Sequence, residues 1–539
     1  MIVDCQSDFE RPGVRPKWRG VAISTVALFS LLMFFAAPLA ADEDSQKVDR
    51  SATLIQTGKL DEAEGLLWDV LKQHPENAQA LTLLGSIRLQ QKRFAESETL
   101  LSRATSLAPD LLPAYVNLAR VFEAQDDTDK EIAALLNAVR LAPSDPAVNS
   151  TLGAAYLKQN DYHRALEVLQ RIPASHRPDK ALPLLAASYL GLGSVEKARA
   201  LVPAVMAHAA KNRALPVEFA EVLLDFGLVN DALAVLQAAE KQPPLPAEFF
   251  FAMGRVRERR GELMLAQKNF QRAVELNPKS VDALQSLARL LAGQEKWKES
   301  LELLTRSRAI APDSPDVLRK FAAASLHAGH PEDAVDAAQR LIRLRPDETE
   351  AMYLLGVAQL QDGDAEQART TLDNYLKLRP ADPLAFLAMG MVQVNLHDAS
   401  AARTDFEQCI KLDPKQVEAY YELGSISKDQ GDAAAAIPYL EKATTIDPGH
   451  ARAHALLGQL YLSQRDYDKA QQHLTRAAEL SPNVPDTHYQ LGLLFARLNQ
   501  RDRAQREMDQ FHKLKEKENP SPVAPGSKPA SSSPPYPPS

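Results

Sequence analysis

Residues 451–484 read ARAHALLGQLYLSQRDYDKAQQHLTRAAELSPNV, and this stretch decides how the rest of the chain is interpreted. Apolar residues recur at helical spacing on both sides of a short polar break at residues 464–466. Pro482 ends the second apolar segment, because proline has no N–H to donate and clashes with the preceding helical turn. Gly458 and Ala470 are small residues, placed where two helix backbones would approach closely. The stretch therefore predicts a helix, a tight turn and an antiparallel helix.

The same unit recurs along the chain with a period of 34 residues. Glycine or alanine returns at the eighth position of the unit, alanine at the twentieth and proline at the thirty-second. A unit of this size cannot bury a core alone, so stacked units must cover one another's apolar faces. We predict fourteen units, which start at residues 44, 78, 112, 146, 179, 213, 247, 281, 315, 349, 383, 417, 451 and 485.

This pattern resembles the tetratricopeptide repeat, whose units carry a large residue, Leu-Gly, Tyr, Ala, a large apolar residue and Pro at this period. In the quoted unit these are His454, Leu457, Gly458, Tyr461, Ala470, Leu474 and Pro482. The resemblance covers residues 44–518. It implies an all-α fold, a right-handed superhelical solenoid of about fourteen helix-turn-helix repeats. It also implies a non-catalytic protein of the exported bacterial type, which binds segments of partner proteins in its concave groove.

Both ends of the chain differ from the repeats. Residues 1–41 are interpreted as a signal peptide, because residues 20–41 carry no charge, follow a basic segment and precede an acidic start. We expect cleavage near Ala40 or Ala41 and export to the periplasm or cell envelope. An uncleaved anchor in the inner membrane is the alternative, since about 20 apolar residues can span a bilayer. Residues 519–539 contain eight prolines and are expected to form a disordered tail.

Residues 173–246 are the least regular part of the array. Pro173 is expected to shorten the second helix of the fourth repeat, and Pro183 and Pro203 can each kink a helix of the fifth. Two explanations stay open for this region: tolerated sequence drift, and a functional bend between two stiffer halves.

Composition limits the class of partner. The chain has 62 basic and 70 acidic residues and a net charge of −8, which argues against nucleic acid, because phosphate binding needs a basic face. The two cysteines are Cys5, which a cleaved chain would lose, and Cys409. Cys409 stands at a packing position and is interpreted as a buried, small apolar residue.

The sequence contains no phosphate-binding loop, nucleophile elbow, HExxH motif or paired-cysteine motif, so we predict no catalytic, cofactor or metal site. An enzyme is the alternative class, and the lack of such motifs opposes it. His450 and His454 could share a helix face, but no carboxylate motif accompanies them, and His454 fills a packing position. His327 and His330 flank a turn and are expected to be exposed.

The resemblance implies that the groove is lined by positions 2, 5, 9, 12 and 13 of the first helix of each repeat. The apolar candidates at these positions are Tyr353, Val357, Leu387, Met391, Tyr421 and Tyr489. A basic band suited to carboxylates would be formed by Arg255, Arg259, Arg289 and Arg319. Packing against neighbouring repeats is the alternative role for the apolar set. Pairing is the alternative for the basic set, with Glu221, Asp225 and Glu258 as partners.

The residues do not identify the partner. A subunit of a polysaccharide export apparatus, or of a secretion or pilus assembly apparatus, is the alternative function, and a polysaccharide is then the alternative ligand.

Overall fold

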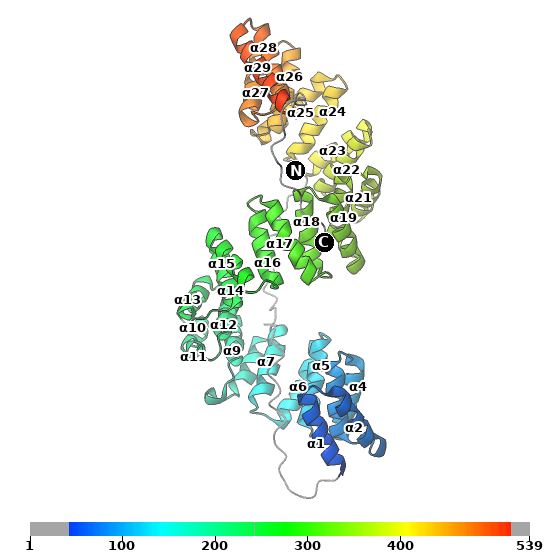
Figure 1. Ribbon diagram of the computed structural model, residues 1–539, viewed down its shortest axis with the longest axis vertical. Coiled ribbons are helices and arrows are strands. Elements are labelled where there is room, and N and C mark those ends of the chain that lie inside the picture. The colour runs from blue at the N-terminus through cyan, green and yellow to red at the C-terminus, as the bar shows by residue number, and fades with distance from the viewer. Residues whose placement is uncertain (1–42, 242, 519–539) are drawn as a thin grey trace, which may run out of the picture. The chain divides into compact units, whose positions relative to one another are not determined.

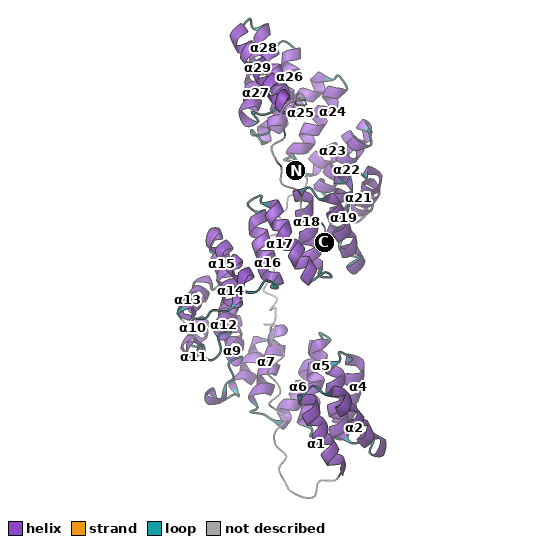
Figure 2. Cartoon of the chain, viewed as in Figure 1, coloured by secondary structure: helices purple, strands orange, loops and turns teal. Residues whose placement is uncertain are grey.

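The computed structural model describes residues 43–241 and 243–518, and every regular element in this part of the chain is a helix (Figure 1, Figure 2). The predicted all-α class of tandem helix pairs is confirmed. The chain divides between residues 294 and 295 into two units. We call their described parts the N-terminal unit (residues 43–294) and the C-terminal unit (residues 295–518) and describe each separately.

In the N-terminal unit the helices follow one another in antiparallel pairs, with a single 3₁₀ turn at Ala174–His176. They are α1 (Glu43–Gln56), α2 (Leu60–Gln73), α3 (Ala78–Gln90), α4 (Phe94–Leu107), α5 (Leu112–Ala124), α6 (Thr128–Leu141), α7 (Pro146–Lys158), α8 (Tyr162–Gln170), α9 (Ala181–Gly191), α10 (Val195–Arg199), α11 (Val202–His208), α12 (Leu215–Asp225), α13 (Val229–Glu240), α14 (Ala247–Arg259), α15 (Leu263–Leu276) and α16 (Val281–Ala292).

The C-terminal unit begins with a second helix of a repeat and continues in regular pairs. Its helices are α17 (Trp297–Ile310), α18 (Pro315–Ala328), α19 (Pro331–Leu344), α20 (Thr349–Gln361), α21 (Ala365–Leu378), α22 (Pro383–Asn395), α23 (Ala399–Leu412), α24 (Val417–Asp429), α25 (Ala433–Ile446), α26 (Ala451–Ser463), α27 (Tyr467–Leu480), α28 (Pro485–Arg497) and α29 (Arg501–Glu518).

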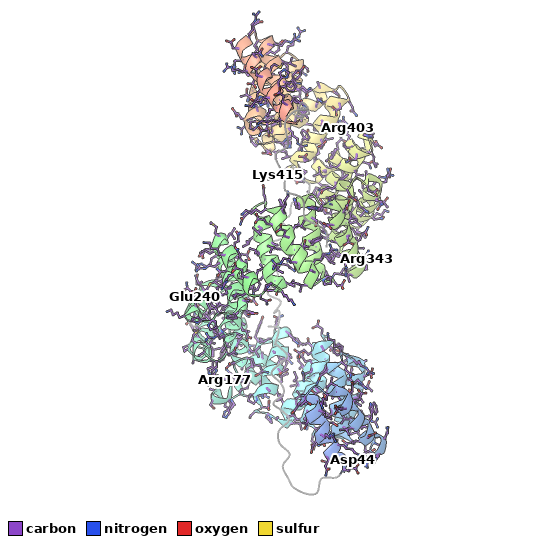
Figure 3. The ribbon with its side chains drawn as sticks, viewed as in Figure 1. Asp44, Arg177, Glu240, Arg343, Arg403 and Lys415 are labelled. Carbon is purple, nitrogen blue, oxygen red and sulfur yellow. The ribbon has the colours of Figure 1, made fainter. Side chains whose placement is uncertain are left out.

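The apolar side chains of each unit pack between its helices. Phe219 and Phe270 of the N-terminal unit and Phe406 of the C-terminal unit are among the largest fully buried side chains. Charged side chains such as Arg343 and Lys415 project from the surface (Figure 3). None of the helices in residues 43–518 is long and apolar enough to cross a membrane, and residues 20–41 and 519–539 lie outside the described part of the chain.

The quoted unit shows how the sequence sets the helix ends. Asp466 caps α27, because its carboxylate accepts a hydrogen bond from the backbone N–H of Lys469 at 3.2 Å. Arg465 adopts a φ of 62° in the turn before it, which allows α27 to run back along α26. The imidazole of His450 caps α26 in the same way, since its Nδ1 lies 3.1 Å from the backbone nitrogen of Ala453.

The glycine at the eighth position allows the two helices of a repeat to meet. A Cβ atom added to Gly458 of α26 would lie 2.5 Å from Cγ of Leu474 and 3.0 Å from the backbone nitrogen of the same residue on α27. Gly390 and Gly424 face Phe406 and Leu440 with similar closeness. The regular recurrence of small residues at this position of the repeats is thus a steric requirement of the helix pair.

We expect Gly458→Leu to reduce stability by roughly 1–3 kcal/mol, because the added side chain overpacks the contact with α27. Gly65 is the matched control, since it lies exposed within α2 and has no atom within 4 Å of an added Cβ. Gly65→Leu should leave stability unchanged or raise it by up to about 1 kcal/mol, because leucine has the higher helix propensity. Urea denaturation followed by circular dichroism measures both, and equal midpoints for the two variants would contradict this packing.

The prolines of the irregular region act differently from one another. α8 ends at Gln170, before Pro173, and the second helix of the fifth repeat is divided into α10 and α11, with Pro203 in the first turn of α11. The expected kink at Pro183 is wrong. Pro183 is the third residue of α9, where the backbone N–H has no partner within the helix, so the proline is accommodated.

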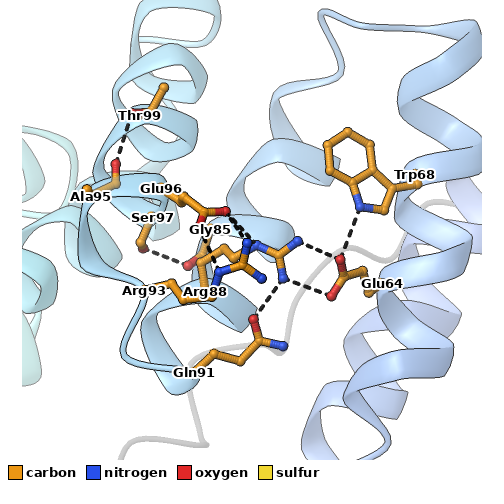
Figure 4. A network of polar contacts seen from close by, with 10 residues as sticks. All are labelled: Glu64, Trp68, Gly85, Arg88, Gln91, Arg93, Ala95, Glu96, Ser97 and Thr99. Carbon is orange, nitrogen blue, oxygen red and sulfur yellow. Dashed lines mark hydrogen bonds and ion pairs between the residues drawn. The ribbon is translucent and has the colours of Figure 1, made fainter.

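A polar network joins α2 to α3 and α4 near the start of the N-terminal unit (Figure 4). The guanidinium of Arg88, only 5% exposed, donates to both carboxylate oxygens of Glu64 at 2.8 and 2.5 Å and to the side chain of Gln91 at 2.8 Å. Trp68 donates from its indole nitrogen to the same carboxylate at 3.2 Å. The hydrogen bond from Arg88 lowers the pKa of Glu64 to about 2, so the carboxylate is ionised at neutral pH.

Cys409 is fully buried on α23, as expected from its position. Burial raises the pKa of its thiol to about 12. We expect no reaction with a thiol reagent at pH 8 in the folded protein and complete reaction in denaturant. A Cys5→Ser background keeps the assay specific for Cys409, and rapid labelling of the folded Cys5→Ser protein would contradict the burial.

Candidate functional site

Four first helices of the C-terminal unit, α20, α22, α24 and α28, carry the apolar groove candidates. We call the accessible side chains at their predicted lining positions the first-helix face. On α20, Tyr353 is half-buried, and its ring centroid lies 5.7 Å from that of Tyr375 on α21. The hydroxyl of Tyr375 donates to Asp382 at 2.5 Å. One side of the Tyr353 ring is thus held by a second, anchored aromatic ring.

Tyr421 of α24 is held in place by side chains of the following repeat. It is half-buried, with the guanidinium of Arg452 4.4 Å from its ring centroid and the ring of His450 5.1 Å away. Arg452 also forms an ion pair with Glu418, and His450 Nε2 lies 3.3 Å from the same carboxylate. Groups from the start of α26 therefore fix both the tyrosine and the carboxylate of the preceding repeat.

Two carboxylates of α24 differ in their electrostatics. Burial alone would raise the pKa of Glu418, but the hydrogen bond with His450 and the charge of Arg452 outweigh it and lower the pKa to about 2. Burial, and then repulsion by Glu418, raise the pKa of Glu422 to about 7. Helix α24 thus carries one permanent and one titratable negative charge near Tyr421.

The remaining apolar candidates separate into accessible and buried residues. Met391 is half-buried, and Tyr489 is 39% exposed, with its ring 5.3 Å from that of Phe511. Val357 and Leu387 are 0% and 2% exposed, so the expectation that they line an accessible face is wrong. Both side chains are enclosed by the packing between helices, which was the alternative role.

Three of the four arginines of the expected basic band are already paired. Arg255 forms an ion pair with Glu221, and Arg289 pairs with Glu258 of the preceding repeat. Arg319 pairs with Glu348 and lies 3.2 Å from Glu350. The expectation of a basic band open to partner carboxylates is therefore wrong at these three positions, because acidic residues 29 to 34 positions away along the chain lie within reach.

The fourth arginine, Arg259, is exposed on the last turn of α14 and stays a candidate. Around Arg319 the surface forms a hollow of about 610 Å³, lined by Arg319, Glu350 and residues 344–348. The paired charges make this hollow polar, in contrast to the aromatic surroundings of Tyr353 and Tyr421.

The histidines do not assemble a metal site: within the described ranges no three His, Cys, Asp or Glu side chains are placed to hold an ion. His454 is buried at its packing position, whereas His450 caps α26. The expected exposure of His327 is wrong. Its ring is half-buried and stacks on Trp297 of α17 with centroids 3.9 Å apart.

Sequence reasoning did not identify Glu418, Glu422 and Arg452 as neighbours of Tyr421. The signal was present, because Glu418, Tyr421 and Glu422 are spaced three and four residues apart and so share one helix face. Arg452 contacts Glu418, and the two residues are 34 positions apart, which is one full repeat. They therefore occupy the same position in successive repeats.

Family models match most of the repeat region. Three models described as tetratricopeptide repeat match residues 54–121 and 428–476, residues 251–315, 321–383 and 387–451, and residues 112–145; a fourth, described as TPR repeat, matches residues 458–499.

Superkiller complex protein 3 of Mus musculus is 25% identical over 256 residues, which cover 46% of this chain and 16% of that protein. Protein CTR9 homolog of Arabidopsis thaliana is 25% identical over 284 residues, which cover 50% of this chain and 26% of that protein. The chain thus spans a small part of the length of both relatives.

Among solved structures, the APC/C hetero-tetramer Cut9–Hcn1 has a TM-score of 0.41 at 16% identity, covering 84% of this chain and 97% of that chain. MamA from Desulfovibrio magneticus RS-1 has a TM-score of 0.30 at 25% identity, covering 32% and 98%.

Proposed function

Because the chain belongs to the tetratricopeptide repeat family, we propose that it is a non-catalytic scaffold that binds a segment of a partner protein on the first-helix face of the C-terminal unit. Two curated relatives carry the names of complex subunits, Superkiller complex protein 3 and anaphase-promoting complex subunit 6, which supports a role in protein association.

The surroundings of Tyr421 carry this proposal. A half-buried tyrosine offers a large contact area with few rotatable bonds and a hydroxyl group, which is why tyrosine is enriched at interfaces. Arg452 and His450 already hold the ring in place, so binding would cost little ordering of this side chain. Tyr353 and Met391, on earlier first helices of the same unit, add accessible apolar contacts.

Site-specific photocrosslinking tests the proposal. A photoreactive phenylalanine analogue replaces Tyr489, which is 39% exposed on the first-helix face, or Arg343, which is exposed on the second helix α19. In cells that produce the protein naturally, we expect one discrete protein adduct from position 489 and none from position 343. Equal adducts from both positions, or none from either, would reject the first-helix face as the binding site.

We further propose that the protein acts in the bacterial cell envelope, after export directed by residues 20–41. Amino-terminal sequencing of the protein from its native source should give a start near Asp42. A start at Met1 in the membrane fraction would favour the uncleaved anchor, and a start at Met1 in the cytoplasm would reject export.

A further inference from the structure

We propose that the repeat formed by α26 and α27 contains a proton-sensitive contact: the pair His454–His473 joins the two helices without burying a positive charge only while both imidazole rings are neutral. Mild acidification would then loosen this repeat selectively. The inference concerns the conformation of the chain itself and does not depend on the function proposed above.

The geometry of the pair carries the argument. His454 of α26 is 9% exposed, and its Nδ1 lies 2.9 Å from Nδ1 of His473 on α27, within hydrogen-bond distance. The ring of His473 stacks on that of Tyr461, whose hydroxyl donates to Glu441 of α25 at 2.5 Å. The second nitrogen of His454, Nε2, is buried near the carbonyl of Pro448 and has no hydrogen bond of good geometry.

A hydrogen bond between two Nδ1 atoms needs one N–H donor and one lone-pair acceptor. Two neutral rings satisfy it, because each neutral imidazole carries one proton on one of its two nitrogens. Protonation of one ring keeps the hydrogen bond but buries a positive charge, and protonation of both rings leaves two N–H groups pointing at each other. Burial, and for His473 also the neighbouring His454, lowers the pKa of both rings from the usual 6.5.

The charged groups around the pair do not supply a dedicated counter-charge. Glu441 on α25 and Asp447 before α26 carry negative charge, and Lys469 and Arg476 on α27 oppose it with positive charge. His450 also faces His454, and it makes its own contact with Glu418 of α24. Protonation of the pair would therefore add a positive charge to surroundings that are already balanced.

The next repeat contains a natural control, because His488 and Glu507 stand 34 residues after His454 and His473. His488 Nδ1 lies 2.7 Å from the carboxylate of Glu507, and its Nε2 lies 3.0 Å from the carbonyl oxygen of Pro482. Both partners are acceptors, so a doubly protonated ring is fully satisfied there. The chain thus holds two equivalent contacts, of which the His488–Glu507 pair has a carboxylate where the His454–His473 pair has a second imidazole.

The direction of the pH effect follows from linkage. A histidine kept neutral in the fold binds a proton only after the repeat opens, so its stabilisation is complete above pH 6.5 and is lost as the pH falls below that value. Between pH 7.5 and 5.5, the equilibrium constant for opening should rise by up to about tenfold for each such histidine.

Hydrogen exchange of the full chain, followed by mass spectrometry and corrected for intrinsic rates, measures this opening. In the wild type we expect residues 451–480 to lose protection by tenfold or more between pH 7.5 and 5.5, while residues 485–518 lose less. His473→Glu, which copies the pair of the following repeat, should abolish the extra loss. An equal loss in both repeats of the wild type, or an unchanged loss in His473→Glu, would overturn the proposal. If His473→Glu does not fold at pH 7.5, His473→Gln is measured instead. Its loss of protection between pH 7.5 and 5.5 must be smaller than that of the wild type, because only one titrating ring remains.

A consequence for partner binding rests on the function proposed above. α26 also carries Arg452, which contacts Tyr421 and Glu418 of α24, so loosening α26 would disturb the first-helix face. Capture of the crosslinked partner should then fall at pH 5.5 in the wild type and persist in His473→Glu. Absence of capture at pH 7.5 in both proteins would reject the proposed function and leave the exchange result standing.

Discussion

Replacing Glu64 by leucine is expected to cost the N-terminal unit roughly 3–5 kcal/mol, because it leaves the buried guanidinium of Arg88 without its bidentate partner. Glu96, 3.4 Å from Nε of Arg88, remains but is itself about half exposed and shared with Arg93. Urea denaturation followed by circular dichroism measures the loss, and hydrogen exchange of residues 60–107 locates it in the first two repeats.

Two further variants separate the ion pair from general packing. The double variant Glu64→Leu with Arg88→Met should recover most of the stability, since apolar groups of similar size can replace a buried pair at little cost. Glu62→Leu is the matched control on the same helix, because Glu62 is 57% exposed and lies 3.5 Å from Lys59. Its removal should cost less than about 1 kcal/mol. A loss of equal size for Glu62→Leu and Glu64→Leu would show that the network does not support the fold.

The pair also predicts an acid response. The pKa of Glu64 is lowered in the fold to about 2, so its stabilisation is present above the usual pKa of 4.5 and is lost as the pH falls from 4.5 towards 2. This loss begins at a lower pH than the loss expected at His454 and His473, so the two effects can be measured separately in one titration.

The repeat pattern predicted the helix pairs because its information is steric and local. Gly458 faces Leu474 at a distance that no larger residue allows, and α8 ends at Gln170, shortly before Pro173. Pro183 shows the limit of this reasoning. Its effect depends on whether it falls in the first turn or further along, and the boundary of α9 at Ala181 was not predictable to that accuracy.

The candidate site was less predictable, because exposure depends on contacts between repeats. Val357 and Met391 occupy the same position of their repeats, yet one is fully buried and the other is half-buried. The ion pair of Arg289 and the contact of His454 with His473 join residues 31 and 19 positions apart on facing helices. Polar residues at packing positions indicate that such pairs exist, but the distances between their atoms are known only from the structure.

The largest functional effect is expected from the double variant Tyr353→Ala with Tyr421→Ala. Truncation of one anchoring tyrosine typically costs 2 kcal/mol or more, which is about thirtyfold in affinity. We therefore expect the double variant to abolish photocrosslinking from position 489 and to weaken binding of the identified partner by at least about thirtyfold.

Stability must be controlled in this experiment, because the structure gives both tyrosines packing contacts. Tyr353 lies against Tyr375, and Tyr421 lies against His450 and Arg452. Tyr439→Ala with Tyr467→Ala is the matched control, since it removes two half-buried tyrosine rings from the second helices α25 and α27 of the same unit. Both double variants should retain a helical spectrum and should lose similar stability through lost ring contacts.

Comparison of the two double variants distinguishes binding from packing. If only Tyr353→Ala with Tyr421→Ala loses the partner, the first-helix face binds it directly. Both double variants lose ring packing, so the lost packing alone does not explain the lost binding. If both lose the partner in proportion to their lowered melting temperatures, the tyrosines act as packing elements and the first-helix assignment fails. If both fold and bind as the wild type does, the partner must occupy another surface of the chain. The next experiments are then substitution of exposed residues on the second helices and deletion of residues 519–539.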